Sequence, residues 1–136
     1  MTPHDKRLSD VCTLCATLLG ARGYATTEAL DAVTQALRDF PDSPALWCLR
    51  GDTIQLLDTP GNDPSIADAE QSYLKAISLD PAHAEAHESL GHFYDSVLDD
   101  PARAEPFFRR AIAFGAGSSA QAGLDRVLEQ LQRDPR

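Results

Sequence analysis

Hydrophobic residues recur along this chain every three or four positions, which is the pattern of amphipathic helices. The first stripe, from Leu8 to Leu19, predicts a helix from about Asp5 to Ala21. Similar stripes and breaker residues predict further helices over about 27–39, 46–57, 65–79, 84–98, 101–114 and 119–133. The alternating pattern of strands is missing. The sequence therefore predicts an all-α protein.

A second pattern lies on top of the first, because three stretches share one spacing of small and bulky residues. A small residue is followed by a bulky one, a second small one and a proline, at steps of four, three and five positions. The stretches are Ala29–Val33–Ala36–Pro41, Ala69–Tyr73–Ala76–Pro81 and Ala104–Phe108–Ala111, with Ala116 in the place of the last proline. Small residues let a neighbouring helix approach closely. A repeat of about 34 residues built from helix pairs is typical of a solenoid.

Turn signals separate the predicted helices. Residues 58–62 (Asp-Thr-Pro-Gly-Asn) predict an exposed loop, and Asp63 followed by Pro64 predicts a capped helix start. Asp100 before Pro101 predicts another capped start. Pro106 falls inside a predicted helix, which must either begin late or bend there.

The spacing resembles that of the tetratricopeptide repeat. A proline is followed by glycine ten positions later and a large residue thirteen positions later, in Pro41–Gly51–Ile54 and in Pro81–Gly91–Tyr94. Trp47 stands at the family's tryptophan position, where we expect it at a buried helix interface, and Leu90–Gly91 matches the family's Leu-Gly pair. Residues 104–111 (Ala-Glu-Pro-Phe-Phe-Arg-Arg-Ala) look like a variant of the second helix. The chain departs from the pattern at Arg50, where leucine is usual, and at His87, where tryptophan is usual.

The resemblance implies a right-handed α-solenoid that forms a single domain over residues 1–136. It implies three helix-turn-helix repeats, over about 10–43, 44–83 and 84–118, and a capping helix over about 119–133. In the family, the first helix of each repeat lines a concave groove for peptides or partner helices.

Carried over position by position, the groove of the second and third repeats would include a mostly polar set of residues. These candidate partner-binding residues are Cys48, Asp52, Gln55, Glu85, Glu88, His92 and Asp95. Leu56 falls on the same face, and the first repeat would contribute apolar residues such as Val11 and Leu14. Such a groove favours a basic segment with an apolar anchor. The basic clamp that some relatives use for a terminal carboxylate is absent, because Cys48, Asp52, Glu85 and Glu88 occupy comparable positions.

The overall charge agrees with this expectation. The 136 residues include 21 acidic and 12 basic ones, for a net charge of −9. Nucleic acid and anionic membranes are therefore disfavoured as partners. A basic protein is favoured, although the acids could also serve only solubility. Residues 1–10 are charged, which predicts no signal peptide, no run is apolar enough for a membrane span, and three cysteines suit a reducing compartment. We expect a cytoplasmic protein.

Two clusters raise the question of chemistry. Cys12 and Cys15 have the spacing of a redox or metal pair, but they lie in mid-helix on an apolar stripe, which favours buried side chains. His83, His87 and His92 lie near Glu88, but His87 and His92 are five positions apart and not on one helix face. No phosphate loop or nucleophile motif is present. We expect no enzymatic activity, no metal and no cofactor.

The sequence thus predicts an adaptor that binds one protein or peptide in a concave groove. Two alternatives stay open: a chaperone-like protein, or an antidote-like (immunity-like) protein that sequesters one cognate partner. A metal- or thiol-dependent protein using His83, His87 and His92 or Cys12 and Cys15 is less favoured. Exposed solenoid ends also leave a weak homodimer open.

Overall fold

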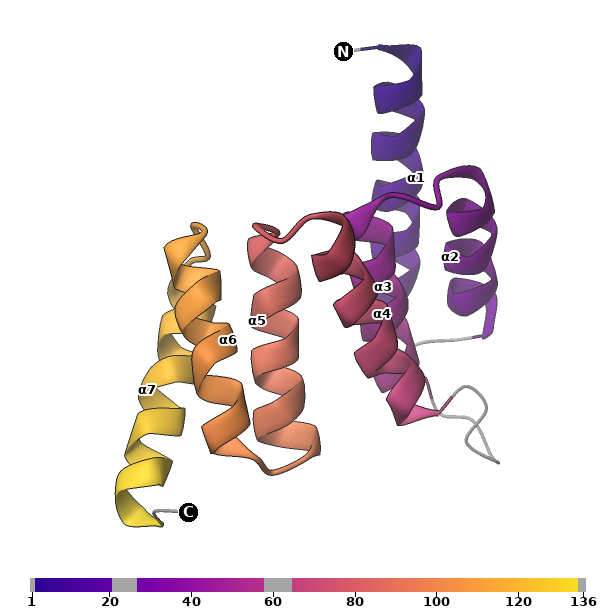
Figure 1. Cartoon of the computed structure of the whole chain (residues 1–136). Helices are drawn as coiled ribbons and strands as arrows, with labels where there is room; N and C mark the ends of the chain where they lie inside the picture. Colours follow the sequence, from indigo (N-terminus) through magenta and orange to yellow (C-terminus); the bar gives the residue numbers. More distant parts are fainter. Residues whose placement is uncertain (1, 21–26, 58–64, 135–136) are drawn as a thin grey trace. The chain divides into compact units, whose positions relative to one another are not determined.

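The structure, a computed structural model, describes residues 2–20, 27–57 and 65–134 (Figure 1). Within these ranges the chain is helical and contains no strand, which confirms the predicted all-α class. The helices are α1 (Pro3–Gly20), α2 (Thr27–Asp39), α3 (Pro44–Leu56), α4 (Ile66–Leu79), α5 (Ala84–His92), α6 (Pro101–Ala113) and α7 (Ser118–Arg133). They form two compact units, Met1–Leu79 and Asp80–Arg136. The predicted loop at 58–62 and the predicted cap at Asp63 lie outside the described residues.

Unit 1 contains α1 to α4, and its core depends on close approach between helices. Cys15, Val33, Ala36, Phe40 and Leu46 form one buried cluster from α1, α2 and α3. The small and bulky residues of the repeated pattern are buried as predicted: the alanines at 29, 36, 69 and 76 and the larger Val33 and Tyr73 are at most 4% exposed. Between α3 and α4, Gly51 leaves room for the Tyr73 ring, since a Cβ there would lie 2.6 Å from ring carbons.

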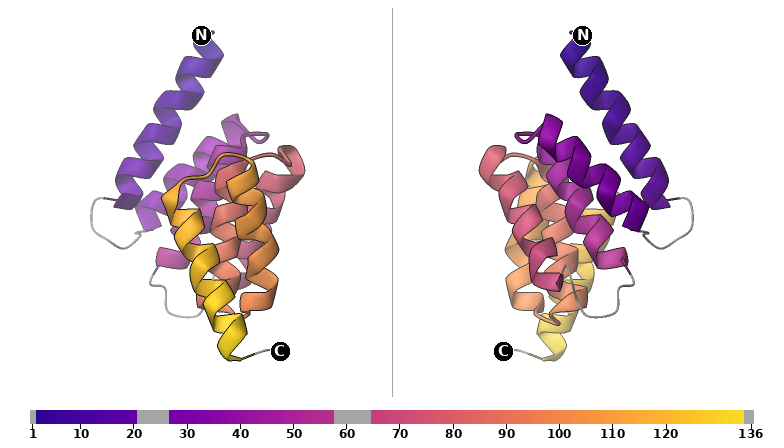
Figure 2. Two further views of the ribbon diagram at one scale, coloured as in Figure 1. Left: turned by 90° about the vertical axis from the view of Figure 1, so that its left-hand side faces the viewer. Right: turned by 90° about the vertical axis from the view of Figure 1, so that its right-hand side faces the viewer.

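Unit 2 packs α5, α6 and α7 against one another (Figure 2). Its centre is Phe108 of α6, which is fully buried. A Cβ at Gly91 of α5 would lie 2.7 Å from the Phe108 ring, and a Cβ at Gly123 of α7 would lie 2.5 Å from it. Both glycines approach the same ring atom, Cε1. The ring therefore has bare backbone on two sides and little freedom to move away from either helix.

Side chains cap the starts of two described helices, α6 and α3. The Asp100 carboxylate accepts a hydrogen bond from the Arg103 amide at 3.1 Å, ahead of Pro101, which confirms the predicted cap of α6. Ser43 caps α3 in the same way, by accepting from the Leu46 amide at 3.3 Å. Pro106 lies inside α6 on its exposed side without ending the helix.

Two details differ from the sequence predictions. The α-helix predicted from Ala84 to Leu98 ends at His92 and continues as a π-helical turn over Phe93–Val97. This wider turn accompanies the burial of three consecutive side chains, those of Phe93, Tyr94 and Asp95. Trp47, expected at a buried interface, is only partly buried. Its indole Nε1 donates a hydrogen bond to the Pro41 carbonyl at 2.8 Å, so the ring lies over the preceding turn.

His87 repeats the arrangement of Trp47 in unit 2. Its Nε2 lies 2.8 Å from the Pro81 carbonyl oxygen, the counterpart of Pro41. Because a carbonyl can only accept, His87 must carry its proton on Nε2. His87 is 4% exposed and lies near the Phe114 ring, with ring centroids 5.3 Å apart. Histidine therefore replaces the family's tryptophan at position 87 but still provides a ring N–H donor to the proline carbonyl.

Gly123→Ala tests the contact with the Phe108 ring. Alanine favours a helix over glycine by about 1 kcal/mol, but overpacking a rigid core costs about 1–3 kcal/mol. We expect a net loss of up to about 2 kcal/mol in the free energy of unfolding, measured by urea denaturation. Gly117→Ala is the control, since nothing lies within 4 Å of a Cβ there. A stabilised Gly123→Ala variant would contradict the close contact.

Candidate partner-binding site

In unit 1 the predicted binding residues lie on α3, but they do not all face solvent. Cys48 is fully buried, so its side chain cannot contact a partner in this structure. Asp52 and Gln55 are partly exposed. The structure brings these two side chains together at one atom of α4, the hydroxyl oxygen of Tyr73.

The Tyr73 hydroxyl donates a hydrogen bond to Asp52 Oδ1 at 2.6 Å and accepts one from Gln55 Nε2 at 2.6 Å. Burial raises the pKa of Tyr73 well above its ordinary value, and the negative charge of Asp52 raises it further. The hydroxyl therefore stays protonated and able to donate. Asp52 and Gln55 hold α3 to α4, so the structure gives both residues an internal role.

In unit 2 the predicted residues follow α5 into the π-helical turn, and two of them face α7. Arg126 Nε donates to Asp95 Oδ2 at 2.9 Å, and the Asp95 side chain is only 7% exposed. His92 Nε2 lies 3.4 Å from Ser119 Oγ of α7, and the His92 ring meets Phe108 edge-on at 4.9 Å. Burial lowers the pKa of His92, although the nearby Glu88 carboxylate opposes the shift. His92 and Asp95 thus attach α7 to α5.

Glu85 and Glu88 have the most open surroundings of the predicted acids. Glu85 is exposed and Glu88 is partly exposed, one helical turn apart on α5. Neither makes an ion pair within residues 2–20, 27–57 or 65–134. Of the four carboxylates predicted to face a groove, these two can meet a basic partner without breaking an internal contact.

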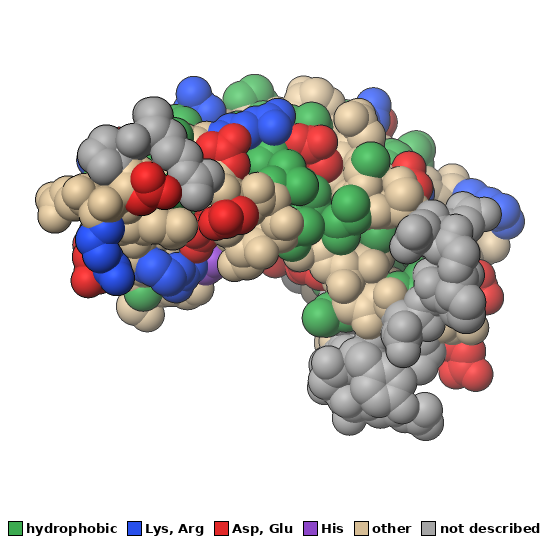
Figure 3. All heavy atoms as spheres, turned by 90° about the horizontal axis from the view of Figure 1, so that it is seen from below, with side chains coloured by type: hydrophobic (Ala, Val, Ile, Leu, Met, Phe, Trp, Pro, Cys, Tyr) green, Lys and Arg blue, Asp and Glu red, His purple; other side chains and the backbone are tan. Residues whose placement is uncertain are grey.

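Hydrophobic side chains are also exposed. On the face drawn in Figure 3 they (green) lie among acidic side chains (red). Two of them occupy predicted groove positions in unit 1. Leu14 of α1 is 57% exposed and Leu56 of α3 is 44% exposed. Exposed leucines at these positions suit the apolar anchor that the sequence predicts.

The candidates for metal or thiol chemistry are not brought together as a site. Within the described ranges, no three His, Cys, Asp or Glu side chains are grouped so that they could hold a metal ion. His87 is bonded to the Pro81 carbonyl, whereas His92 faces Ser119. Burial raises the pKa of the Cys15 thiol, which disfavours the reactive thiolate.

Two arginines matter in the structure that the sequence did not single out as functional. Arg126 of α7 pairs with Asp95, and no local sequence signal points to that pair. Arg50 was noted as a departure from leucine. Its Nη1 donates to Ser72 Oγ at 2.5 Å and lies 3.4 Å from the Asp68 carbonyl oxygen, so it joins α3 to α4.

Comparison with solved structures identifies the fold. The crystal structure of the Sgt2 TPR domain from Aspergillus fumigatus superposes with a TM-score of 0.76, covering 97% of this chain and 82% of that one. The sequences are 18% identical. No protein-family model and no curated protein matches the sequence. The chain therefore has the fold of a tetratricopeptide-repeat domain, an α-solenoid, as the sequence predicted.

In the part of the chain that the structure describes, no helix is both long and apolar enough to cross a membrane.

Tyr73→Phe tests the internal role of Asp52 and Gln55. The change removes one oxygen and with it both hydrogen bonds, one of them to a charged group. We expect a loss of about 1–3 kcal/mol in the free energy of unfolding, measured by urea denaturation. Asp52→Asn is the control, because it keeps an acceptor for the hydroxyl. An effect below about 0.5 kcal/mol for Tyr73→Phe would show that the network does not stabilise unit 1.

His92 predicts a pH dependence of stability. Its pKa in the folded chain lies below the ordinary value of about 6.5, so the unfolded chain binds the proton first as pH falls. The contribution of neutral His92 to the free energy of unfolding is therefore fully present above about pH 6.5, and it is lost as pH falls through the lower pKa of the folded chain. We expect His92→Gln to lose less stability than the native chain between about pH 7.5 and 5.5. Parallel pH profiles of the urea midpoint would contradict this assignment.

Proposed function

We propose that this protein is an adaptor that binds a basic peptide or protein segment along the first helices of its helix pairs. One observation carries the proposal: Glu85 and Glu88 of α5 form no ion pair with any residue that the structure describes. By contrast, Asp52 and Asp95 are engaged by Tyr73 and Arg126. The acidic part of the binding surface is therefore narrower than the sequence predicts.

The apolar part of the proposal rests on unit 1. Leu14 and Leu56 are exposed at positions that the family resemblance assigns to the binding face. A partner that covers them would gain about 25 cal/mol for each Å² of apolar surface removed from water. Charged residues on the α5 face would then add selectivity and faster association with basic partners.

The test compares three forms of the chain in a pull-down from the lysate of the source organism, with quantified capture at low and high salt. The forms are the native chain, Glu85→Lys/Glu88→Lys, and the control Asp125→Lys/Glu129→Lys. The control makes the same change of charge in the same unit, on exposed positions of α7. Circular dichroism verifies that all three forms stay helical.

We expect the native chain and the control to capture one partner that the Glu85/Glu88 variant retains about tenfold less. Capture by the native chain should fall as salt rises, because exposed charges are screened. Equal capture by all three forms would remove α5 from the binding site. Capture that is equally strong at high salt would exclude a charge-based interface.

The same purified partner separates the two special forms of this proposal. A chaperone-like protein would bind an extended segment of its partner, so a synthetic peptide from that segment should compete. An antidote-like protein would need the folded partner, and no short peptide should compete with it.

A further inference from the structure

Among the helices that the structure describes, α6 alone carries a net positive charge. Within its bounds, the three arginines at positions 103, 109 and 110 outnumber one acid, Glu105, which gives α6 a charge of +2. The whole chain has a net charge of −9. The surface of α6 therefore differs in sign from the rest of the molecule.

Two of these arginines lie over aromatic rings. The Arg110 guanidinium carbon is 5.2 Å from the centroid of the Phe107 ring, and the Arg103 guanidinium carbon is 4.2 Å from that of Tyr94. The two rings are neighbours, with centroids 5.2 Å apart. A guanidinium that is stacked on a ring keeps its N–H groups at the edge of its plane. It therefore loses little freedom when these groups bind a carboxylate.

Arg110 is available to a carboxylate from another molecule. It is exposed, and it forms no ion pair with any residue that the structure describes. The neighbouring Arg109 differs, because its Nε donates a hydrogen bond to Glu105 at 2.8 Å. The acid of α6 is thus paired with Arg109, and the charge of Arg110 remains uncompensated.

An exposed aromatic ring lies beside Arg110. Phe114, four positions later and so on the same side of the helix, is 44% exposed. The other large hydrophobic side chains that are exposed in the described ranges are aliphatic. The Phe114 ring lies 5.3 Å, centroid to centroid, from that of the buried His87. We call Phe107, Arg110 and Phe114 the Arg110 patch, in which a fixed cation adjoins an apolar contact surface.

We propose that the Arg110 patch binds an acidic segment of a partner protein. A carboxylate of that segment pairs with Arg110, because a guanidinium binds a carboxylate through two parallel hydrogen bonds. A large apolar side chain next to the carboxylate covers Phe114 and removes its ring from water. The patch has the opposite charge to Glu85 and Glu88 of α5, so it takes a different partner and does not depend on them.

The charge of the chain favours a short acidic segment over larger anions. Salt at about 0.1 M screens exposed charges beyond about 10 Å, so a short segment interacts mainly with α6 itself. Nucleic acid also offers an anion to Arg110, but its extended row of phosphates would lie against a chain of net charge −9. A second copy of the chain brings the same net charge and is disfavoured for that reason.

The test is a titration of the ¹⁵N-labelled chain, followed by NMR, with three capped tripeptides of sequence Asp-Phe-Asp, Asp-Ala-Asp and Lys-Phe-Lys. We expect Asp-Phe-Asp to shift the backbone amides of Phe107, Arg110 and Phe114 saturably, with a dissociation constant near 1 mM. The alanine peptide should bind more weakly, and the lysine peptide should cause no saturable shift. No saturable shift up to about 10 mM, or equal shifts with all three peptides, would overturn the proposal.

Two further titrations separate the other occupants. Tighter binding of a short single-stranded oligothymidine than of Asp-Phe-Asp would assign the patch to nucleic acid and overturn the proposal. Shifts of the same amides when the protein concentration alone is raised would assign it to a second copy instead.

Three variants locate the site. Arg110→Gln should weaken binding of Asp-Phe-Asp about three- to tenfold. Arg133→Gln is the matched control, since it removes another exposed arginine of unit 2, and it should bind like the native chain. Glu85→Gln/Glu88→Gln should also bind like the native chain, so the proposals for α5 and α6 can fail separately. Equal affinities of Arg110→Gln and Arg133→Gln would overturn the assignment to the Arg110 patch.

Discussion

Close contact between an aromatic ring and bare glycine backbone is the constraint on which both units depend. Tyr73 lies against Gly51, and Phe108 lies against Gly91 and Gly123. At each place the helices come together because no Cβ stands between them and the ring. The buried alanines of the repeated pattern continue the close contact between helices along their length. This packing in turn determines where the polar side chains beside the rings lie.

The polar contacts beside the buried ring differ between the two units because only one of the rings carries a hydroxyl group. In unit 1 the ring residue is tyrosine, and its hydroxyl engages Asp52 and Gln55 within the α3–α4 pair. In unit 2 the corresponding residue is Phe108, which has no hydroxyl. The corresponding positions, His92 and Asp95, instead contact Ser119 and Arg126 on α7. The same face of a first helix thus stabilises a hairpin in one unit and holds the last helix in the other.

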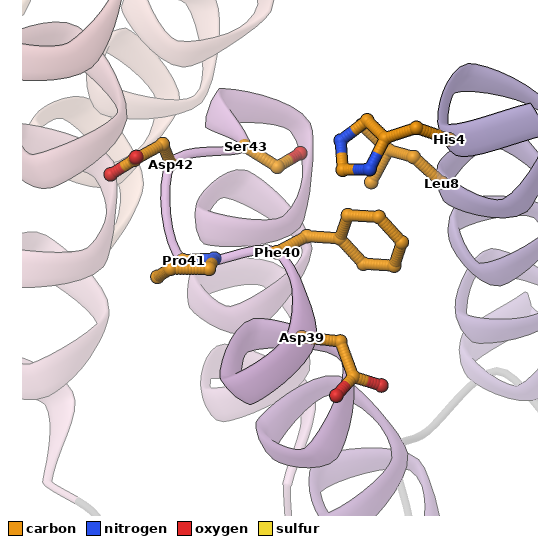
Figure 4. A pocket seen from close by; sticks show the side chains of 7 residues that line it. All are labelled: His4, Leu8, Asp39, Phe40, Pro41, Asp42 and Ser43. Carbon is orange, nitrogen blue, oxygen red and sulfur yellow. The ribbon is translucent and has the colours of Figure 1, made fainter. Parts of the chain in front are cut away.

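The fold was predictable from the sequence because it depends on local periodicity, small residues and capping, all of which are visible along the chain. The candidate site was predictable only in outline. Whether Asp95 is available to a partner depends on its ion pair with Arg126. Arg126 lies far from Asp95 in the sequence, and the two side chains come together only through the packing of α7. The small pocket that His4, Leu8 and Phe40 line (Figure 4) was not predictable, because it forms where the start of α1 lies beside a later turn. The π-helical turn at Phe93–Val97 likewise reflects packing around rings and not a sequence signal.

Position 47 holds tryptophan and the corresponding position 87 holds histidine, and this difference determines which unit the fluorescence of the chain reports on. Both rings donate to a proline carbonyl at 2.8 Å, but only the indole of Trp47 fluoresces strongly, and the chain has one tryptophan. Intrinsic emission therefore reports on unit 1, whereas the helical ellipticity sums both units. In a solenoid, whose repeats contact only their neighbours, these two signals separate whenever one unit melts before the other.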